Sequence, residues 1–156
     1  MAVSKDEFRK GLSRFASGVT VVTCKGESGC QGLTVSAFSS LSLDPPLVLI
    51  CVHSSSAVHD GLKEGRFFAV NILAEDQEPI SRVFASRIPD RFNGVSFRDG
   101  QTGAPLIEGA LAFIECRVVH EYPGGDHTIL VGQVESSVMR EGKPLLYFGG
   151  DYAQLR

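Results

Sequence analysis

The chain has 156 residues, of which 43% are hydrophobic and 21% charged, and its net charge is −3 with a pI near 5.8. This length and composition predict a single domain over residues 1–156 with an apolar core, and the acidic balance without any Lys/Arg cluster excludes the pattern of a nucleic-acid-binding protein. The longest apolar run is far shorter than a membrane span, and the charged first ten residues lack an apolar signal region, so we expect a cytoplasmic protein without membrane contact.

A short helix is predicted near the N-terminus. Ser4 and, three residues later, Glu7 match a capping box. Phe8, Leu12 and Phe15 follow at spacings of four and three, so one face of this helix is apolar. Gly18 is expected to end it.

Most of the remaining chain is predicted to form strands, because β-branched and aromatic residues dominate its apolar runs. The expected strands are, in chain order, 19–24, 30–38, 46–52, 66–73, 110–119, 127–138 and 144–148. Two short helices are expected between them, one after the serines of 53–65 and ending at Gly65, and one over 79–85 with Pro79 in its first turn. This pattern indicates a mainly β fold with a few short helices, in the form of a small antiparallel barrel.

The segment 31–46 is unusual because it is rich in hydroxyls and its first thirteen residues carry no charge. Alternate side chains of a strand face opposite sides, so Gly32, Thr34 and Ser36 are expected to share one face while the apolar residues between them face the core. The hydroxyl face either meets solvent or binds a flat, neutral ligand with a polar edge. Small hydroxyl side chains leave room for such a ligand and offer it both donors and acceptors.

A second polar cluster, Ser54–Ser56, precedes the helix expected in 53–65. Free N–H groups at a helix start attract phosphate, although Ser56 alone also suits the role of an N-cap. Arginines in or just after the second predicted helix either supply a phosphate charge or lie in solvent. They are Arg82, Arg87 and Arg91.

No nucleophilic or metal-binding constellation stands out. Asp126 and His127 are adjacent, and within one strand they would face opposite sides, so no carboxylate–imidazole pair is expected between them. A catalytic Cys–His pair stays open, but no pattern favours one. No metal site is predicted, because the cysteines lack a C-x-x-C pair and are interpreted as buried free thiols in preference to a metal pair. They are Cys24, Cys30, Cys51 and Cys116.

Six fragments in order resemble the flavin reductase family, the short-chain reductase components of two-component flavin-dependent monooxygenases. The resemblance runs from "FRKGLSRFASGVTVVT" through "GLTVSAFSSLSLDPPLVLICV", "FFAVNILAEDQ" and "GDHTILVGQV" to "PLLYFGGDY", with the late "LLYF" inside it. It implies the FMN-binding split barrel, a Greek-key antiparallel barrel that works as a homodimer. It further implies NAD(P)H-dependent reduction of FMN or FAD, with the reduced flavin leaving for a partner oxygenase.

The resemblance also implies the site residues. The hydroxyl-rich segment would meet the flavin, and the segment after the next strand would pass near its ribityl chain and phosphate. His127 of "GDH" would lie beside the nicotinamide as the catalytic residue, and Tyr152 would cover the cofactor. The cofactor-binding residues implied are Thr34, Val35, Ser36, Ala37, Ser39, Ser40, Cys51, His53, Ser54, Ser55, Ser56, Ser86, Arg87, Phe92, His127 and Tyr152.

Such a protein needs no acid–base apparatus, because flavin and nicotinamide carry the chemistry and the protein supplies binding and orientation. Two alternatives stay open: a split-barrel flavoprotein that retains FMN and oxidises another substrate, and a non-catalytic flavin-binding protein. FMN and FAD are equally compatible with the sequence. NADH is preferred to NADPH, since no obvious basic pocket for a 2′-phosphate is present.

Overall fold

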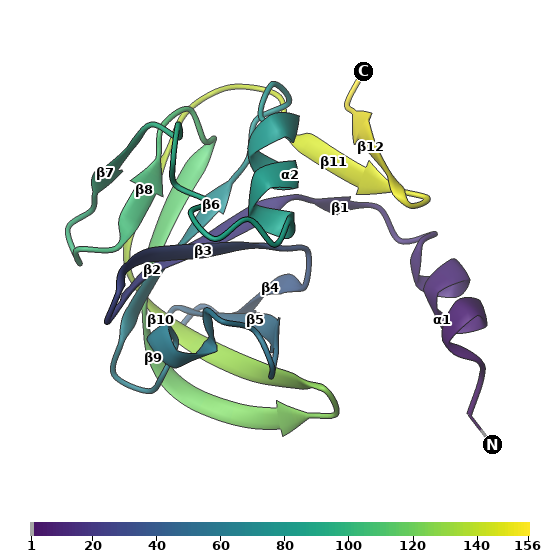
Figure 1. The fold of residues 1–156 in the computed structure, drawn as a ribbon, viewed down its shortest axis with the longest axis horizontal. Coiled ribbons are helices and arrows are strands. Elements are labelled where there is room, and N and C mark those ends of the chain that lie inside the picture. Colours follow the sequence, from purple (N-terminus) through teal and green to yellow (C-terminus); the bar gives the residue numbers. More distant parts are fainter. Residues whose placement is uncertain (1) are drawn as a thin grey trace.

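The computed structural model describes residues 2–156, and its largest part is one curved antiparallel sheet of seven strands (Figure 1). The strand order is β3-β2-β6-β9-β10-β5-β4. The bounds are β2 Thr20–Gly26, β3 Gly29–Val35, β4 Phe38–Ser42, β5 Leu47–His53, β6 Phe67–Ile72, β9 Ala112–Gly124 and β10 His127–Met139. The prediction of a mainly β fold is confirmed. The seven-stranded sheet does not close into a barrel by hydrogen bonds, because its two edge strands, β3 and β4, do not pair with each other.

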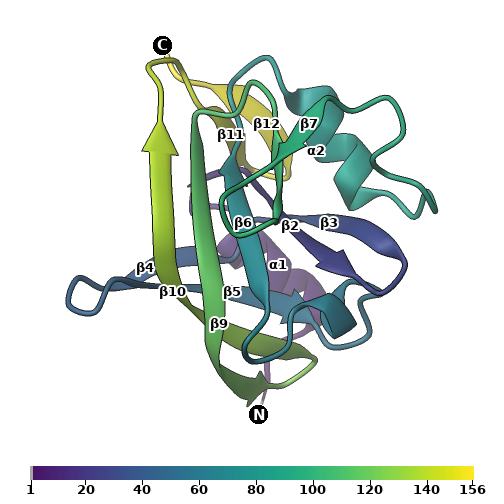
Figure 2. The ribbon, with the colours of Figure 1, turned by 90° about the vertical axis from the view of Figure 1, so that its left-hand side faces the viewer.

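Short elements surround this sheet. Three strands, β1, β11 and β12, form a small sheet, and β7 pairs with β8. Figure 2 shows β11 and β12 near the C-terminus. Their bounds are β1 Ser17–Gly18, β7 Phe97–Asp99, β8 Pro105–Ile107, β11 Leu145–Phe148 and β12 Asp151–Gln154. The helices are α1 Lys5–Leu12 and α2 Glu78–Ala85. Within residues 2–156, neither is long and apolar enough to cross a membrane.

Strand alternation decides which side chains of β5 enter the core. Val48, Ile50 and Val52 are buried in the main cluster, together with side chains from β2, β6 and β10. Leu49 and Cys51 therefore lie on the opposite, outer face of the strand, where they are only half-buried. This outer face becomes one wall of the site described below.

Gly132 of β10 is required by close packing. A Cβ atom at this position would lie 2.6 Å from Cζ of Phe68 and 2.9 Å from Cβ of Cys116. Gly132→Ala is therefore expected to destabilise the fold by about 1–3 kcal/mol, since the core must shift to admit one methyl group. Urea unfolding followed by circular dichroism measures the loss.

Gly11→Ala is the matched control for this substitution. Gly11 lies in α1 with nothing within 4 Å of its would-be Cβ, so alanine there is expected to be neutral or to stabilise the helix by about 0.5–1 kcal/mol. An unchanged urea midpoint for Gly132→Ala would contradict the close contact with Phe68.

The capping box of α1 is confirmed, but the helix ends earlier than predicted. The Ser4 side chain accepts from the N–H of Glu7, and the Glu7 carboxylate accepts from the N–H of Ser4. The helix stops at Leu12, not at Gly18. Gly18 is instead extended and pairs with Leu146, so the small sheet determines its conformation.

The apolar face of α1 is not buried in this chain. The helix has no buried residue, and its body stands apart from the sheet (Figure 1). Phe8, Leu12 and Phe15 are 56%, 61% and 82% exposed. Three large apolar side chains on one side of a projecting segment need a further partner, because exposed apolar patches of this kind mark interaction sites.

The helix predicted in 53–65 is wrong, and only a 3₁₀ turn at His59–Gly61 is present. Gly61 is buried so tightly that a Cβ there would lie 2.8 Å from Sγ of Cys24. The N–H of Gly65 donates to the carbonyl of Val118, so the segment is held to the sheet as a loop. The second predicted helix is confirmed as α2, with Pro79 in its first turn.

Candidate functional site

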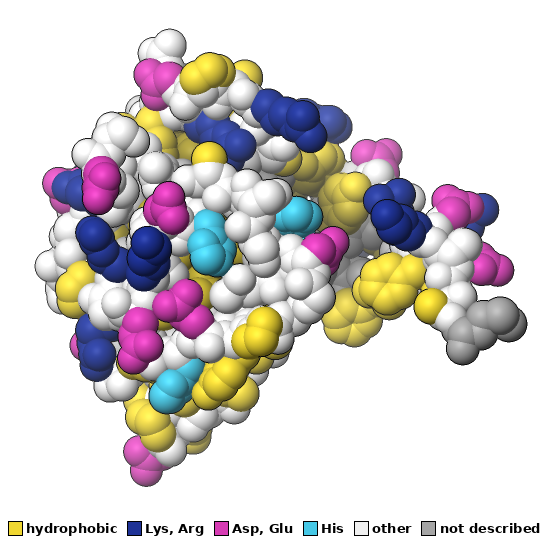
Figure 3. Space-filling model, turned by 60° about the horizontal axis from the view of Figure 1, so that its bottom comes forward, with side chains coloured by type: hydrophobic (Ala, Val, Ile, Leu, Met, Phe, Trp, Pro, Cys, Tyr) yellow, Lys and Arg dark blue, Asp and Glu magenta, His cyan; other side chains and the backbone are white. Residues whose placement is uncertain are grey.

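A cavity of about 910 Å³ lies between α1 and the outer face of the main sheet. Figure 3 shows apolar side chains on both sides of the gap between the projecting N-terminal segment and the body. The volume is within the range of sites for small molecules and cofactors. The lining residues are Phe8, Arg9, Lys10, Leu12, Ser13, Phe15, Ser17, Ser36, Ala37, Phe38, Ser39, Leu49, Cys51, Tyr147 and Gly150.

The interruption between β3 and β4, at Ser36 and Ala37, forms part of the cavity wall. We call these two residues the break. The strand predicted over 30–38 is divided here, because β3 ends at Val35 and β4 begins at Phe38. The carbonyl of Ala37 accepts from the N–H of Cys51, and both residues of the break are exposed. Their small side chains allow a ligand to approach the backbone closely.

Four of the predicted flavin-binding residues meet at this cavity. Ser36 and Ala37 come from the break, Ser39 from β4, and Cys51 from the outer face of β5. Ser39 lies opposite Leu49 in the strand register, which places both on the same face. Ser40 lies opposite the core residue Val48 and does not line the cavity.

The expected open hydroxyl face of β3 is covered by α2, which corrects the sequence interpretation. The Thr34 hydroxyl donates to the carbonyl of Ser81 at 2.6 Å. A Cβ at Gly32 would meet Phe84 of the same helix at 2.8 Å. Val35 belongs to the core cluster. Alternation predicted the two faces correctly, but it could not show that a helix packs on the polar one.

Three further predicted residues lie around α2 and away from the cavity. Phe92 is only 9% exposed, with its ring at 5.0 Å from that of Phe84. The Ser86 hydroxyl donates to the carbonyl of Val83 at the end of the helix. Arg87, the next residue, is exposed.

Tyr152 also packs against α2. Its hydroxyl is 2.7 Å from the hydroxyl of Ser81, and the Arg82 guanidinium lies 4.9 Å from the centre of its ring. Arg82 is further paired with Glu78, while the third arginine considered, Arg91, donates to a backbone carbonyl in β3. A different tyrosine, Tyr147, lines the cavity.

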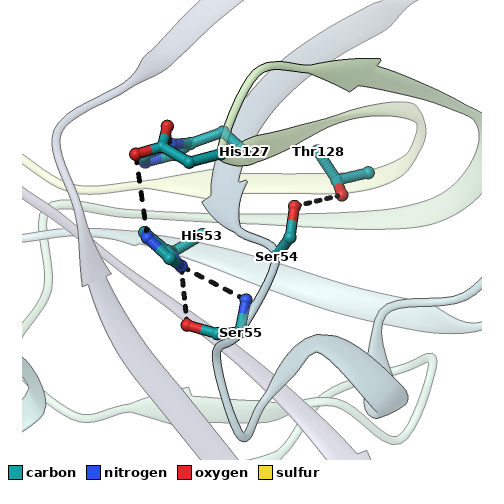
Figure 4. Close-up of polar contacts among 6 residues, drawn as sticks. His53, Ser54, Ser55, His127 and Thr128 are labelled. Carbon is teal, nitrogen blue, oxygen red and sulfur yellow. Dashed lines mark hydrogen bonds and ion pairs between the residues drawn. The ribbon is translucent and has the colours of Figure 1, made fainter.

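A histidine cluster lies where β5 ends and β10 begins (Figure 4). His53 and His127 are opposite in register, and their ring centres are 5.1 Å apart at an angle of 63°. Asp126 lies between them, with Oδ1 at 2.7 Å from Nδ1 of His127 and Oδ2 at 3.8 Å from Nε2 of His53. We call these three residues the histidine cluster.

The contact between Asp126 and His127 corrects the sequence interpretation. Asp126 is part of the turn before β10, so strand alternation does not govern its direction. Its carboxylate can therefore turn back to the imidazole of the next residue. The hydrogen bond from His127 holds the pKa of Asp126 below its ordinary value, so the carboxylate is ionised at neutral pH.

The histidine cluster is continuous with the cavity. Leu49, Cys51 and His53 alternate along β5 and share its outer face. His127 lies on the same face, because it pairs with His53. A ligand in the cavity and a second ligand at the histidine cluster would therefore lie on neighbouring parts of one sheet surface.

The three serines after β5 are engaged locally. The hydroxyl of Ser54 is 3.4 Å from that of Thr128. Ser55 contacts Nδ1 of His53 through both its hydroxyl and its N–H. Ser56 accepts from the N–H of Val58, but it is not an N-cap, because the 3₁₀ turn that replaces the predicted helix has Val58 at that position.

All four cysteines are free, but only two are buried. Burial raises the pKa of Cys24 and of Cys116 to about 12, so both stay as neutral thiols. Cys30 and Cys51 are half-buried. Across residues 2–156, no three His, Cys, Asp or Glu side chains gather in a way that could hold a metal ion.

Sequence reasoning missed several residues of this site. Strand alternation directs Asp126 away from His127, and no sequence pattern distinguishes Leu49 or Tyr147 from the other residues of their strands. The spacing of Phe8, Leu12 and Phe15 predicts one apolar face of α1, but it does not show that this face forms a wall of the cavity.

Comparison with known proteins identifies relatives of the whole chain. Residues 12–156 match the family model described as a flavin reductase-like domain. The chain is 44% identical over 152 residues to an NADH-dependent flavin reductase from a Rhodococcus species, covering 94% of this chain and 84% of that protein. It is 39% identical to the reductase subunit of a flavin-dependent monooxygenase from Mycobacterium tuberculosis, covering 93% and 79% of the two chains.

The structure is similar to that of an NADH:FAD oxidoreductase from Streptomyces globisporus, solved in complex with NAD and FAD fragments. The TM-score is 0.93 at 38% sequence identity, with 100% of this chain and 97% of that chain covered. A similarity of this extent covers the backbone of the whole described chain, with the sheet and both helices.

Proposed function

The chain belongs to the flavin reductase-like family, and from this membership we propose that it is an NADH-dependent flavin reductase. It reduces FMN or FAD and supplies the reduced flavin to the oxygenase component of a two-component monooxygenase. The observation that carries the proposal is the cavity, which brings Ser36, Ala37, Ser39 and Cys51 together beside the histidine cluster.

The cavity fits a flavin in size and in chemistry. Its volume of about 910 Å³ admits a three-ring system. Leu49 and Tyr147 offer apolar surface for the faces of the rings, and Ser36 and Ser39 offer hydroxyls for a polar edge. Each such hydrogen bond contributes about 0.5–1.5 kcal/mol, so several must act together with the stacking.

In the proposed reaction, the residues of this chain bind and orient the flavin and the nicotinamide, and none of them transfers a proton. Flavin, when bound, supplies the chemistry by accepting a hydride from NADH. Ser36 and Ala37, between β3 and β4, would hold the flavin ring, and His127, on the same outer face as Cys51, would hold the nicotinamide. Keeping the two rings in reactive contact is the main contribution of the protein.

NADH oxidation measured with and without added flavin tests this function. Rapid oxidation of NADH that requires added FMN or FAD is expected, and comparing the two flavins determines the preference. Oxidation that needs no added flavin, in a preparation that retains FMN, would favour the flavoprotein alternative. A folded protein that binds flavin without oxidising NADH would favour the non-catalytic one.

The proposal includes a homodimer. The exposed apolar face of α1 and the cavity beneath it form one continuous apolar surface, and closed two-fold dimers are the commonest soluble assemblies. A second copy of this chain is proposed to cover the exposed outer part of the α1 face, while the cavity itself holds the flavin. The partner copy would then close the flavin cavity from the side that α1 leaves open.

Light scattering at micromolar concentration is expected to give about 34 kDa, twice the 16.8 kDa of one chain. Phe15→Asp is expected to shift the mass toward the monomer, because a charge would be placed in the buried contact. Leu43→Asp is the control, since Leu43 is exposed but does not line the cavity. A monomeric mass for the unaltered protein would overturn the dimer.

The proposal also treats residues 1–156 as one domain that works in the cytoplasm. Four free cysteines, one of them in the wall of the cavity, suit a reducing compartment. Fractionation of the producing cells, followed by an assay of flavin-dependent NADH oxidation in each fraction, tests the location.

A further inference from the structure

The hydrogen bonds of the histidine cluster define which nitrogen of each ring carries the proton. The N–H of Ser55 can only donate, and it points at Nδ1 of His53 at 3.2 Å. Nδ1 of the neutral His53 ring is therefore the acceptor, and its proton is on Nε2. That Nε2–H faces Oδ2 of Asp126 at 3.8 Å.

The second ring has the opposite arrangement. The carboxylate of Asp126 can only accept, and its Oδ1 is 2.7 Å from Nδ1 of His127. Nδ1 of His127 therefore carries the proton. Nε2 of the neutral ring keeps its lone pair, so His127 presents a hydrogen-bond acceptor to any ligand that reaches it.

The two rings and the carboxylate are held as one unit. Ser55 anchors His53 with two contacts, and the edge of one histidine ring faces the other at 5.1 Å. Asp126 contacts both rings, one through each oxygen. Asp126 is itself exposed, so without these contacts its side chain would have several rotamers to choose from.

We propose that His53 and Asp126 are positioning residues, which hold His127 as its Nδ1–H tautomer so that Nε2 accepts a hydrogen bond from the nicotinamide nucleotide. The ligand chemistry is a neutral donor, such as a carboxamide NH₂ or a ribose hydroxyl. This role rests on the proposed function of His127, but the tautomer itself is a property of the free protein.

Nitrogen-15 NMR of the ligand-free protein, labelled at histidine, tests the tautomer without any assay of activity. At a pH where the rings are neutral, the long-range proton–nitrogen correlations are expected to show His127 protonated at Nδ1 and His53 at Nε2. In Asp126→Ala, His127 is expected to change to the Nε2–H form that an unconstrained histidine side chain prefers. An Nε2–H His127 in the unaltered protein would overturn the proposal.

Two substitutions at His53 separate its contacts. In His53→Gln the side-chain amide N–H takes the place of Nε2–H and still faces Asp126. In His53→Asn the amide oxygen takes the place of Nδ1 and contacts only Ser55. His53→Asn is expected to lower kcat/KM for NADH by about 3- to 10-fold, because it removes the polar contact with Asp126 while keeping the one with Ser55, and His53→Gln by less, with KM for flavin unchanged in both.

His120→Asn is the matched control, because His120 is exposed on β9 and contacts Tyr122 instead of the histidine cluster. It is expected to leave kcat/KM for NADH unchanged. Equal losses in His53→Gln and His53→Asn would overturn the role of the Asp126 contact. An Nδ1–H tautomer in a protein that does not oxidise NADH would leave the positioning in place and sink only the proposed function.

Discussion

Replacing His127 by alanine is expected to lower kcat/KM for NADH by about 10- to 100-fold, which corresponds to about 1.4–2.7 kcal/mol of lost transition-state stabilisation. The ring lies on the same outer sheet face as Cys51, next to the cavity that holds the flavin in the proposed function. Without it, the nicotinamide loses its hydrogen-bond acceptor and part of its position beside the flavin ring. Flavin affinity is expected to be nearly intact, because His127 is not among the residues that line the cavity.

Steady-state kinetics that vary NADH and flavin separately measure the two effects. His59→Ala is a suitable control, since the His59 ring contacts the hydroxyl of Thr128 beside the cluster but lies outside it. A histidine that served only the fold would, when removed, lower the melting temperature and raise the KM of both substrates together. An unchanged kcat/KM for NADH would remove His127 from the site.

Much of the fold was predictable because local rules and tertiary packing agree there. Ser4 and Glu7 form the capping box that their spacing predicts. The run 46–52 alternates between core and outer face as a strand should. The predicted helix at 79–85 forms, with its proline in the first turn.

The predictions failed where long-range contacts override local preference. Gly18 has a neighbour in β11 that the sequence around it does not reveal, so it is extended. Gly61 must fit against Cys24, and the loop that results replaces the expected helix. The strands β7, β8 and β12 are too short to carry an alternation signal of their own.

The candidate site was predictable in its residue types more than in its geometry. The hydroxyl-rich segment does reach the cavity, but only from Ser36 onward, because the helix α2 covers Thr34. The contact of Asp126 with His127 depends on a turn conformation, so strand periodicity cannot predict it. The sequence predicts the apolar face of α1 but not its partner, which in the proposed dimer belongs to the second copy of the chain.

Replacing Ser36 by lysine is expected to weaken flavin binding by about tenfold or more while leaving the fold intact. Ser36 is exposed, lies between two strands and lines the cavity. A lysine side chain there takes space that the ring needs, and a ring that loses about 60 Å² of apolar contact loses about 1.5 kcal/mol, close to tenfold in affinity. Exposed substitutions of this kind change the free energy of unfolding by no more than about 0.5 kcal/mol.

The measurements that test Ser36→Lys are the flavin Kd, by fluorescence titration, and the melting temperature. Ser36→Met, equally long but uncharged, separates the steric effect from any attraction of the lysine for a flavin phosphate, and Ser137→Lys is the matched control on an exposed serine of β10 outside the cavity. If Ser36→Lys and Ser36→Met both bind flavin as tightly as Ser137→Lys does, the flavin does not lie over the break between β3 and β4.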